Sequence, residues 1–126
     1  MEKKVVYTPA APAAIGPYSQ GIVAGDFVYV SGCLPIDITT GELSTGDVAE
    51  MTRCSLRNVS AILEAAGSNL SKVVKTTVFV KDLANFATIN AAYAEFFADA
   101  APARSCVQVA ALPKGAELEI EAVALL

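Results

Sequence analysis

The chain has 126 residues, enough for one domain around one hydrophobic core. Hydrophobic residues make up 54% of it and charged residues only 17%, whereas a typical soluble domain has about 25% charged residues. So little charge favours burial of surface against further copies of the chain, and we expect an oligomer. The net charge of −4 argues against nucleic acid as a partner, and the lack of histidine excludes Ser-His-Asp and Cys-His catalysis.

The cysteines and the amino-terminal segment indicate where the protein resides. Cys33, Cys54 and Cys106 are far apart and form no CxxC pair, so we expect reduced thiols and no metal site. Pro9 and Pro12 interrupt the segment where a signal peptide would have its apolar core. No apolar stretch reaches the roughly 18 residues that span a bilayer. The sequence therefore predicts a cytoplasmic protein with no membrane partner.

Short strands joined by turns and loops are predicted for the first third of the chain. Apolar residues mark the strands, and glycine-containing pairs such as Gly25-Asp26 mark the turns. In chain order we expect a strand over 5–7, an ordered loop over 10–20, a hairpin of 21–24 and 27–31, and a turn over 39–42.

Two amphipathic helices are predicted for the remainder. Over 47–66 apolar residues recur at helical spacing, Asp47 is a suitable N-cap, and Gly67 lies where a helix commonly ends. A second helix is expected to begin with Asp82 as its cap. Strands are predicted over 73–80, 104–109 and 118–124, the first of them buried on both faces or on most of one.

The order of these elements predicts an α+β fold in which two helices pack on one face of a mixed sheet. The other face then needs a cover, and a partner subunit is the available one. In the last strand, Glu117, Glu119 and Glu121 share one face, and Leu118 and Ile120 lie on the other.

Arg104 is the most informative residue for function. It begins a strand of mostly small or apolar residues, where a guanidinium is costly unless a carboxylate or phosphate meets it. Its planar fork suits a carboxylate. The alternatives are an internal salt bridge to a carboxyl-terminal glutamate, or exposure at the start of the strand. Glu119 either handles protons near Arg104 or belongs to a solvated strand face.

Other positions have both a functional and a structural interpretation. Cys106 leaves the same sheet face as Arg104, but without a histidine to activate it we expect a small buried side chain whose backbone N–H matters more than its sulfur. Tyr18 either lines a site or fills the core, and Gly32 either admits a ligand or shapes a bulge. An aromatic stripe in the second helix is expected in the core: Phe86, Phe96 and Phe97.

The block PARSCVQVAALP, followed by KGAE and LEIEAVA, resembles the carboxyl-terminal signature of the RidA/YjgF family, the reactive intermediate imine deaminases. The resemblance extends to AAIGPYSQG, YVSGCLP and EAAGSNLSKVVKTTVFVKDLANFATINAAYAEFF, and so to nearly the whole chain. It implies a chorismate-mutase-like α+β fold, one domain over 1–126, and a homotrimer whose active clefts lie between subunits.

The resemblance also implies an activity: hydrolysis of 2-iminopropanoate, 2-iminobutanoate and their enamine tautomers to 2-keto acids and ammonia, without metal or cofactor. The carboxylate-binding arginine of the family falls on Arg104, the cysteine with the ligand-binding amide on Cys106, and the glutamate that activates water on Glu119. Further substrate-binding positions match Tyr18, Ser31, Gly32 and Asn90. Cys33 stands where the family has the glutamine of SGQ.

Two other functions remain open at this stage. A trimer that binds keto acids or other small metabolites without turnover, as a regulatory protein, would use the same clefts. Ribonuclease activity and translation inhibition are also attached to the family by name, but the net charge of −4 and the lack of histidine disfavour both.

Overall fold

The computed structural model describes residues 2–126. Its main sheet has six strands in the order β1-β2-β3-β8-β6-β7, and β4 and β5 form a separate hairpin. The strands are β1 (Lys3–Val6), β2 (Gly21–Ala24), β3 (Phe27–Cys33), β4 (Ile36–Asp37), β5 (Glu42–Leu43), β6 (Val73–Val80), β7 (Ala103–Gln108) and β8 (Leu118–Leu125). The helices are α1 (Val48–Ala65) and α2 (Phe86–Ala94), and 3₁₀ turns occur at Leu70–Lys72, Leu83–Asn85 and Pro113–Gly115.

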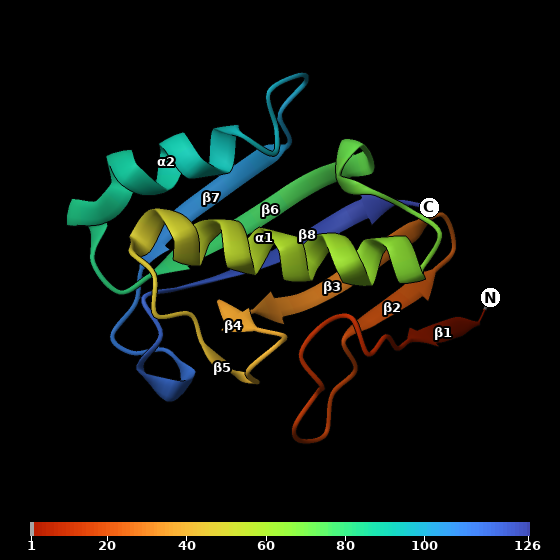
Figure 1. Ribbon diagram of the computed structural model, residues 1–126. Coiled ribbons are helices and arrows are strands. Elements are labelled where there is room, and N and C mark those ends of the chain that lie inside the picture. Colours follow the sequence, from red (N-terminus) through yellow and green to blue (C-terminus); the bar gives the residue numbers. More distant parts are fainter. Residues whose placement is uncertain (1) are drawn as a thin grey trace.

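Both helices cover the same face of the main sheet (Figure 1). β6 and β7 run parallel, and the other neighbouring strands of this sheet run antiparallel. The predicted α+β architecture, a mixed sheet with two helices on one face, is therefore confirmed. β8, the last strand of the chain, lies between β3 and β6 in the middle of the sheet.

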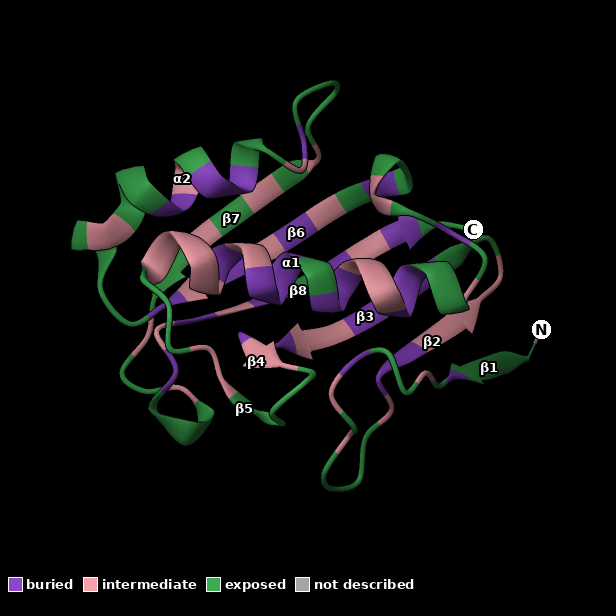
Figure 2. Ribbon diagram, viewed as in Figure 1, coloured by how far each residue is buried: buried purple, intermediate pink, exposed green. Residues whose placement is uncertain are grey.

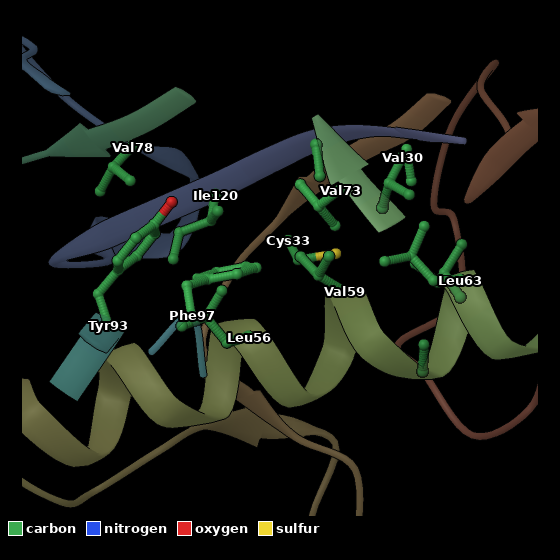
Figure 3. Packing of buried hydrophobic residues seen from close by; sticks show 14 of the residues in the cluster. Val30, Cys33, Leu56, Val59, Leu63, Val73, Val78, Tyr93, Phe97 and Ile120 are labelled. Carbon is green, nitrogen blue, oxygen red and sulfur yellow. The ribbon is translucent and has the colours of Figure 1, made fainter. Parts of the chain in front are cut away.

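The hydrophobic core lies between the helices and the sheet (Figure 3). Leu56, Val59 and Leu63 of α1 are fully buried, and Val78 and Ile120 face them from the sheet. Figure 2 shows buried residues along the central strands and exposed ones on the outer sides of the helices and along β1. The core therefore buries only one face of the sheet.

Local capping signals were sufficient to predict α1 and the first hairpin. The Asp47 carboxylate accepts a hydrogen bond from the Glu50 N–H at 2.9 Å, which caps the first turn of α1. Gly67, just beyond the other end, has a φ of 87°, and Gly25 has a φ of 60° in the turn between β2 and β3. These predictions are confirmed.

The bounds of several elements differ from the prediction. Asp82 accepts a hydrogen bond from the Ala84 N–H at 2.9 Å and thereby caps the 3₁₀ turn, whereas α2 begins only at Phe86. β1 spans Lys3–Val6 and not 5–7, because its length is set by pairing with β2. The side chains of β6 mostly alternate between the core and the uncovered face, which agrees with the second predicted alternative, burial on most of one face.

Candidate active site

Arg104 lies on β7, an edge strand, and its half-buried side chain contacts α2. Its Nη1 donates a hydrogen bond to the Asn90 Oδ1 at 2.7 Å. The guanidinium carbon lies 4.9 Å from the centre of the Tyr93 ring and 5.5 Å from that of Phe86, distances at which cation–π attraction operates. We call these four residues together with Cys106 the Arg104 cluster.

No carboxylate within residues 2–126 lies at salt-bridge distance from Arg104. The other two arginines of the chain do have such partners: Arg53 pairs with Glu95 at 3.0 Å and Arg57 with Glu50 at 2.5 Å. The internal salt bridge considered from the sequence is thus missing from the described chain. A half-buried guanidinium without an internal anion is arranged to receive one from outside.

Cys106 follows Arg104 on the same face of β7. Burial raises the pKa of its thiol, with the nearby Arg104 acting in the opposite direction, so the sulfur is a poor nucleophile. Its backbone is more informative. The Val109 N–H donates to the Val80 carbonyl at 2.9 Å, and alternation along the strand therefore turns the Cys106 N–H away from β6, toward the open edge of the sheet.

A separate groove of about 730 Å³ lies between the loop over 10–20, β3 and β8. We call it the Glu119 groove; its lining includes Tyr18, Ser31, Gly32 and Glu119. β3 departs from regular pairing with β8 at Ser31 and Gly32. A Cβ at Gly32 would lie 2.6 Å from the carboxyl carbon of Glu119, so the glycine leaves the space that this carboxylate occupies.

Hydrogen bonds hold the loop that carries Tyr18 against β3. The Ser31 hydroxyl donates to the Ser19 carbonyl at 2.6 Å, and the Ser31 N–H donates to the Gln20 carbonyl at 3.0 Å. The buried Gln20 side chain in turn bonds backbone groups of residues 8–12. Sequence reasoning did not single out Gln20; a polar side chain closing a proline-rich loop is the signal that could have indicated it.

The surroundings of Glu119 change its acidity. Burial, and to a lesser extent the negative charge of Glu121, raises the pKa of the Glu119 carboxyl. A carboxyl with a raised pKa exchanges protons closer to neutral pH, which suits a general acid or base. Cys33 belongs both to the groove wall and to the core (Figure 3), and burial followed by the charge of Glu119 raises the pKa of its thiol to about 12. This thiol stays protonated.

A single chain does not bring Arg104 and Glu119 together. Arg104 is in register with Thr76, whose buried side chain contacts α2, so the arginine points to the helix side. Glu119 lies between the fully buried Leu118 and Ile120 and therefore points to the uncovered face. Since β6 separates the two strands, their backbones are about 10 Å apart at the usual strand spacing. Within one chain, Glu119 therefore does not lie near Arg104, and the hypothesis that the two act together stays a prediction for an assembly of several chains.

The predicted aromatic stripe divides between core and site, and α2 ends at Ala94, before Phe96 and Phe97. Phe97 is buried as predicted, but Phe86 is 38% exposed and stacks on Arg104. The prediction that Phe86 lies in the core is therefore wrong. Phe86, Asn90 and Tyr93 follow one another at intervals of four and three residues, which puts them on one helix face. That spacing, set opposite a strand arginine, is the signal that sequence reasoning missed.

The remaining chemistry of residues 2–126 is limited. No group of three or more His, Cys, Asp or Glu side chains in this range is placed to hold a metal ion, and the three cysteines are free thiols. None of the helices in the same range has the length and apolar character needed to cross a membrane.

Residues 8–126 match the sequence model of the family described as endoribonuclease L-PSP. The chain belongs to this family. The endoribonuclease L-PSP family is the RidA/YjgF family that the sequence resembles, so the resemblance is confirmed.

Relatives within this family are similar over their whole length. The 2-iminobutanoate/2-iminopropanoate deaminase of Escherichia coli K12 is 54% identical over 125 residues, covering 97% of both chains. A RutC family protein of Pyrococcus horikoshii is 51% identical over 122 residues, again covering 97% of both. Among solved structures, E. coli TdcF with bound serine has a TM-score of 0.93 and 49% identity, covering 98% of both chains. A putative endoribonuclease of Thermotoga maritima has a TM-score of 0.96 and 49% identity, covering 100% of this chain and 98% of that one.

Proposed function

We propose that this chain hydrolyses 2-imino acids and their enamine tautomers, such as 2-iminopropanoate and 2-iminobutanoate, to 2-keto acids and ammonia. The observation that carries the proposal is Arg104, a half-buried cation held by Asn90 and two aromatic rings with no carboxylate partner in the described chain. Relatives named for this activity support the proposal. The serine bound to TdcF has a carboxylate attached to its C2 carbon, as the 2-imino acids have.

The site is proposed to form between the subunits of a homotrimer. Arg104 and Glu119 point to opposite faces of the sheet, so they act on one substrate only if different copies supply them. The Arg104 cluster lies at an edge strand and is free to face the Glu119 groove of a neighbouring copy. The uncovered sheet face exposes apolar side chains suited to such contact, among them Phe27, Tyr29 and Val107.

The chemistry follows from an imine carbon that is already electrophilic. Arg104 binds the substrate carboxylate and fixes C2 in place. Glu119 accepts a proton from a water molecule as the water oxygen bonds to C2 and the C=N electron pair moves to nitrogen. The carboxyl then returns the proton to this nitrogen. The hydroxyl then gives its proton, through the Glu119 carboxylate, to the same nitrogen, so that ammonia leaves as the C–N bond breaks and the keto group forms. Proton transfer of this kind contributes about 10²–10⁴-fold.

The other site residues are proposed to position the substrate. The outward N–H of Cys106 is a second donor for the carboxylate, and Asn90 orients Arg104. Tyr18 and the bulge at Ser31 and Gly32 enclose the reacting nitrogen in the Glu119 groove. The proposed steps need no metal, cofactor or covalent nucleophile.

Removal of Arg104 tests the proposal. A pyridoxal-phosphate-dependent dehydratase acting on threonine generates 2-iminobutanoate in the assay, and release of ammonia and keto acid is followed. Arg104→Ala is expected to lower kcat/KM by about 10²-fold or more, because the carboxylate loses its bidentate partner. Arg57→Ala removes the same charge from the helix surface and is expected to leave the rate unchanged. If the unaltered protein clears the imine no faster than buffer, the proposal is wrong.

A second candidate function, binding without turnover, is favoured by one observation: TdcF holds serine, a stable metabolite. Glu119→Gln separates the two functions. Under the deaminase proposal this variant still binds a 2-keto acid but no longer hydrolyses imines. If the unaltered protein itself binds the keto acid and shows no turnover, the second function is correct. The net charge of −4 continues to disfavour RNA as a substrate despite the family name.

A further inference from the structure

Beside Arg104, two buried hydroxyl groups join α2 to β6. The hydroxyl oxygens of Tyr93 and Thr76 lie 2.7 Å apart, and the two residues are only 6% and 1% exposed. The Tyr93 ring also packs against Phe97, with 4.8 Å between the ring centres. Figure 3 shows the Tyr93 oxygen directed from α2 toward the sheet. The ring is therefore fixed by packing along its side and by a hydrogen bond at its tip.

Arg104 lies over this fixed ring. Its guanidinium carbon is 4.9 Å from the centre of Tyr93, and Nη1 is held by Asn90 at 2.7 Å. Thr76 is the residue in register with Arg104 on the neighbouring strand. The hydroxyl that holds Tyr93 and the arginine that rests on Tyr93 are thus adjacent on one face of the sheet.

The hydrogen bond has a geometric consequence that an apolar pair would not reproduce. A buried hydrogen bond adds little net stability over an apolar pair of the same shape. It does set the orientation of the ring. An arginine side chain has many rotamers, and ordering it during binding lowers affinity, whereas a side chain ordered beforehand avoids that loss.

We infer that Tyr93 and Thr76 are positioning residues: their hydrogen bond fixes the ring on which Arg104 lies, so that the guanidinium is oriented before a substrate carboxylate arrives. The inference rests on the proposed function of Arg104. Because the carboxylate is bound in ground and transition states alike, loss of this orientation acts on KM more than on kcat.

Tyr93→Phe tests the inference, since it keeps the ring and removes the hydroxyl. We expect KM for 2-iminobutanoate to rise about threefold to tenfold while kcat changes less than about twofold. Thr76→Val is expected to have the same effect, and Thr76→Ser, which keeps a hydroxyl, to restore nearly normal KM. Ser55→Ala is the matched control, because it removes a buried hydroxyl that has no hydrogen-bond partner in the described chain. Its KM is expected to be unchanged.

A cycle with Arg104→Ala separates positioning from general structural damage. If Tyr93 acts through Arg104, Tyr93→Phe has no further effect on kcat/KM once Arg104 is gone. An equal loss in both backgrounds would overturn the inference and leave the proposed function intact, as would an unchanged KM in Tyr93→Phe. If the unaltered protein shows no hydrolysis, the proposed function fails. The Kd for 2-ketobutanoate, measured by calorimetry, is then compared between the variants in place of KM. Kd is then expected to rise about threefold to tenfold only where Arg104 is present, and an unchanged Kd overturns the inference.

Discussion

Glu119 depends on its neighbours for both its place and its acidity. Gly32 leaves the space for the carboxylate, and burial followed by the charge of Glu121 raises its pKa. Two further charged groups come close to this face. Glu117 immediately precedes β8 and pairs with Lys81 at 3.9 Å, and Lys114 lines the Glu119 groove. Glu121 also lines the groove, and its replacement by glutamine removes the charge that acts on Glu119 with little change in side-chain shape.

Glu121→Gln is predicted to move the acid side of the pH–rate profile to lower pH. In the proposed mechanism hydrolysis needs deprotonated Glu119, so the rate is expected to fall as the pH drops through the pKa of this carboxyl. Removal of a neighbouring negative charge lowers that pKa, and the fall then begins at a lower pH. The measurement is kcat/KM from acid to neutral pH.

Glu117→Gln serves as the control for this experiment, because it makes the same substitution just before β8, at a carboxylate paired with Lys81. Its profile is expected to coincide with that of the unaltered protein. An acid side that stays in place or moves upward in Glu121→Gln would contradict this account of Glu119.

Among the elements, the irregular part of β3 contributes most directly to the proposed site. Its bulge at Ser31 and Gly32 interrupts pairing with β8 beside Glu119. The same segment holds the Tyr18 loop through the hydroxyl of Ser31. A regular strand would provide neither the space for the carboxylate nor the link to the loop.

Gly32→Ala is predicted to impair hydrolysis while leaving the fold stable. The new Cβ would lie 2.6 Å from the carboxyl carbon of Glu119 and 3.0 Å from its Cγ, so this flexible side chain has to move. Displacement of a reacting group by about 1 Å can cost on the order of 10²-fold in rate. Steady-state kinetics and thermal unfolding together measure the two effects.

Gly67→Ala is the control, because its expected effects on stability and on the rate of hydrolysis are the reverse of those of Gly32→Ala. Gly67 has a φ of 87° and nothing near its Cβ position, so alanine there is expected to destabilise the end of α1 and leave hydrolysis unchanged. Full activity in Gly32→Ala would show that the Glu119 carboxylate does not need its observed position.

The elements that could be predicted from the sequence are those with local signals. Asp47 and Gly67 delimit α1, and Gly25 identifies the turn of the first hairpin. Asp82 was misleading because an aspartate caps a 3₁₀ turn as well as it caps an α-helix. The position of β8 between β3 and β6 depends on pairing between distant segments, which no local pattern contains.

For the whole molecule, the important result is the division of the site residues between two faces of the sheet. The resemblance to the family assigned Arg104 and Glu119 to one site. The alternation of side chains predicts which residues share a face within a single strand, but it does not relate one strand to another. The relation between the two residues depends on β6 lying between β7 and β8, which the sequence does not reveal. The low share of charged residues has a matching structural counterpart, a sheet face that the helices leave uncovered (Figure 1).

The most direct test of this account is complementation between two inactive variants, Arg104→Ala and Glu119→Gln. The variants are unfolded together, refolded so that the proposed homotrimers contain both, and assayed for 2-iminobutanoate hydrolysis. With random assembly, about one quarter of the clefts receive an intact Arg104 from one copy and an intact Glu119 from its neighbour, so about one quarter of the normal activity is expected. If the mixed trimers form, as light scattering would show, and remain as inactive as either variant alone, the claim that the active site is shared between subunits is contradicted.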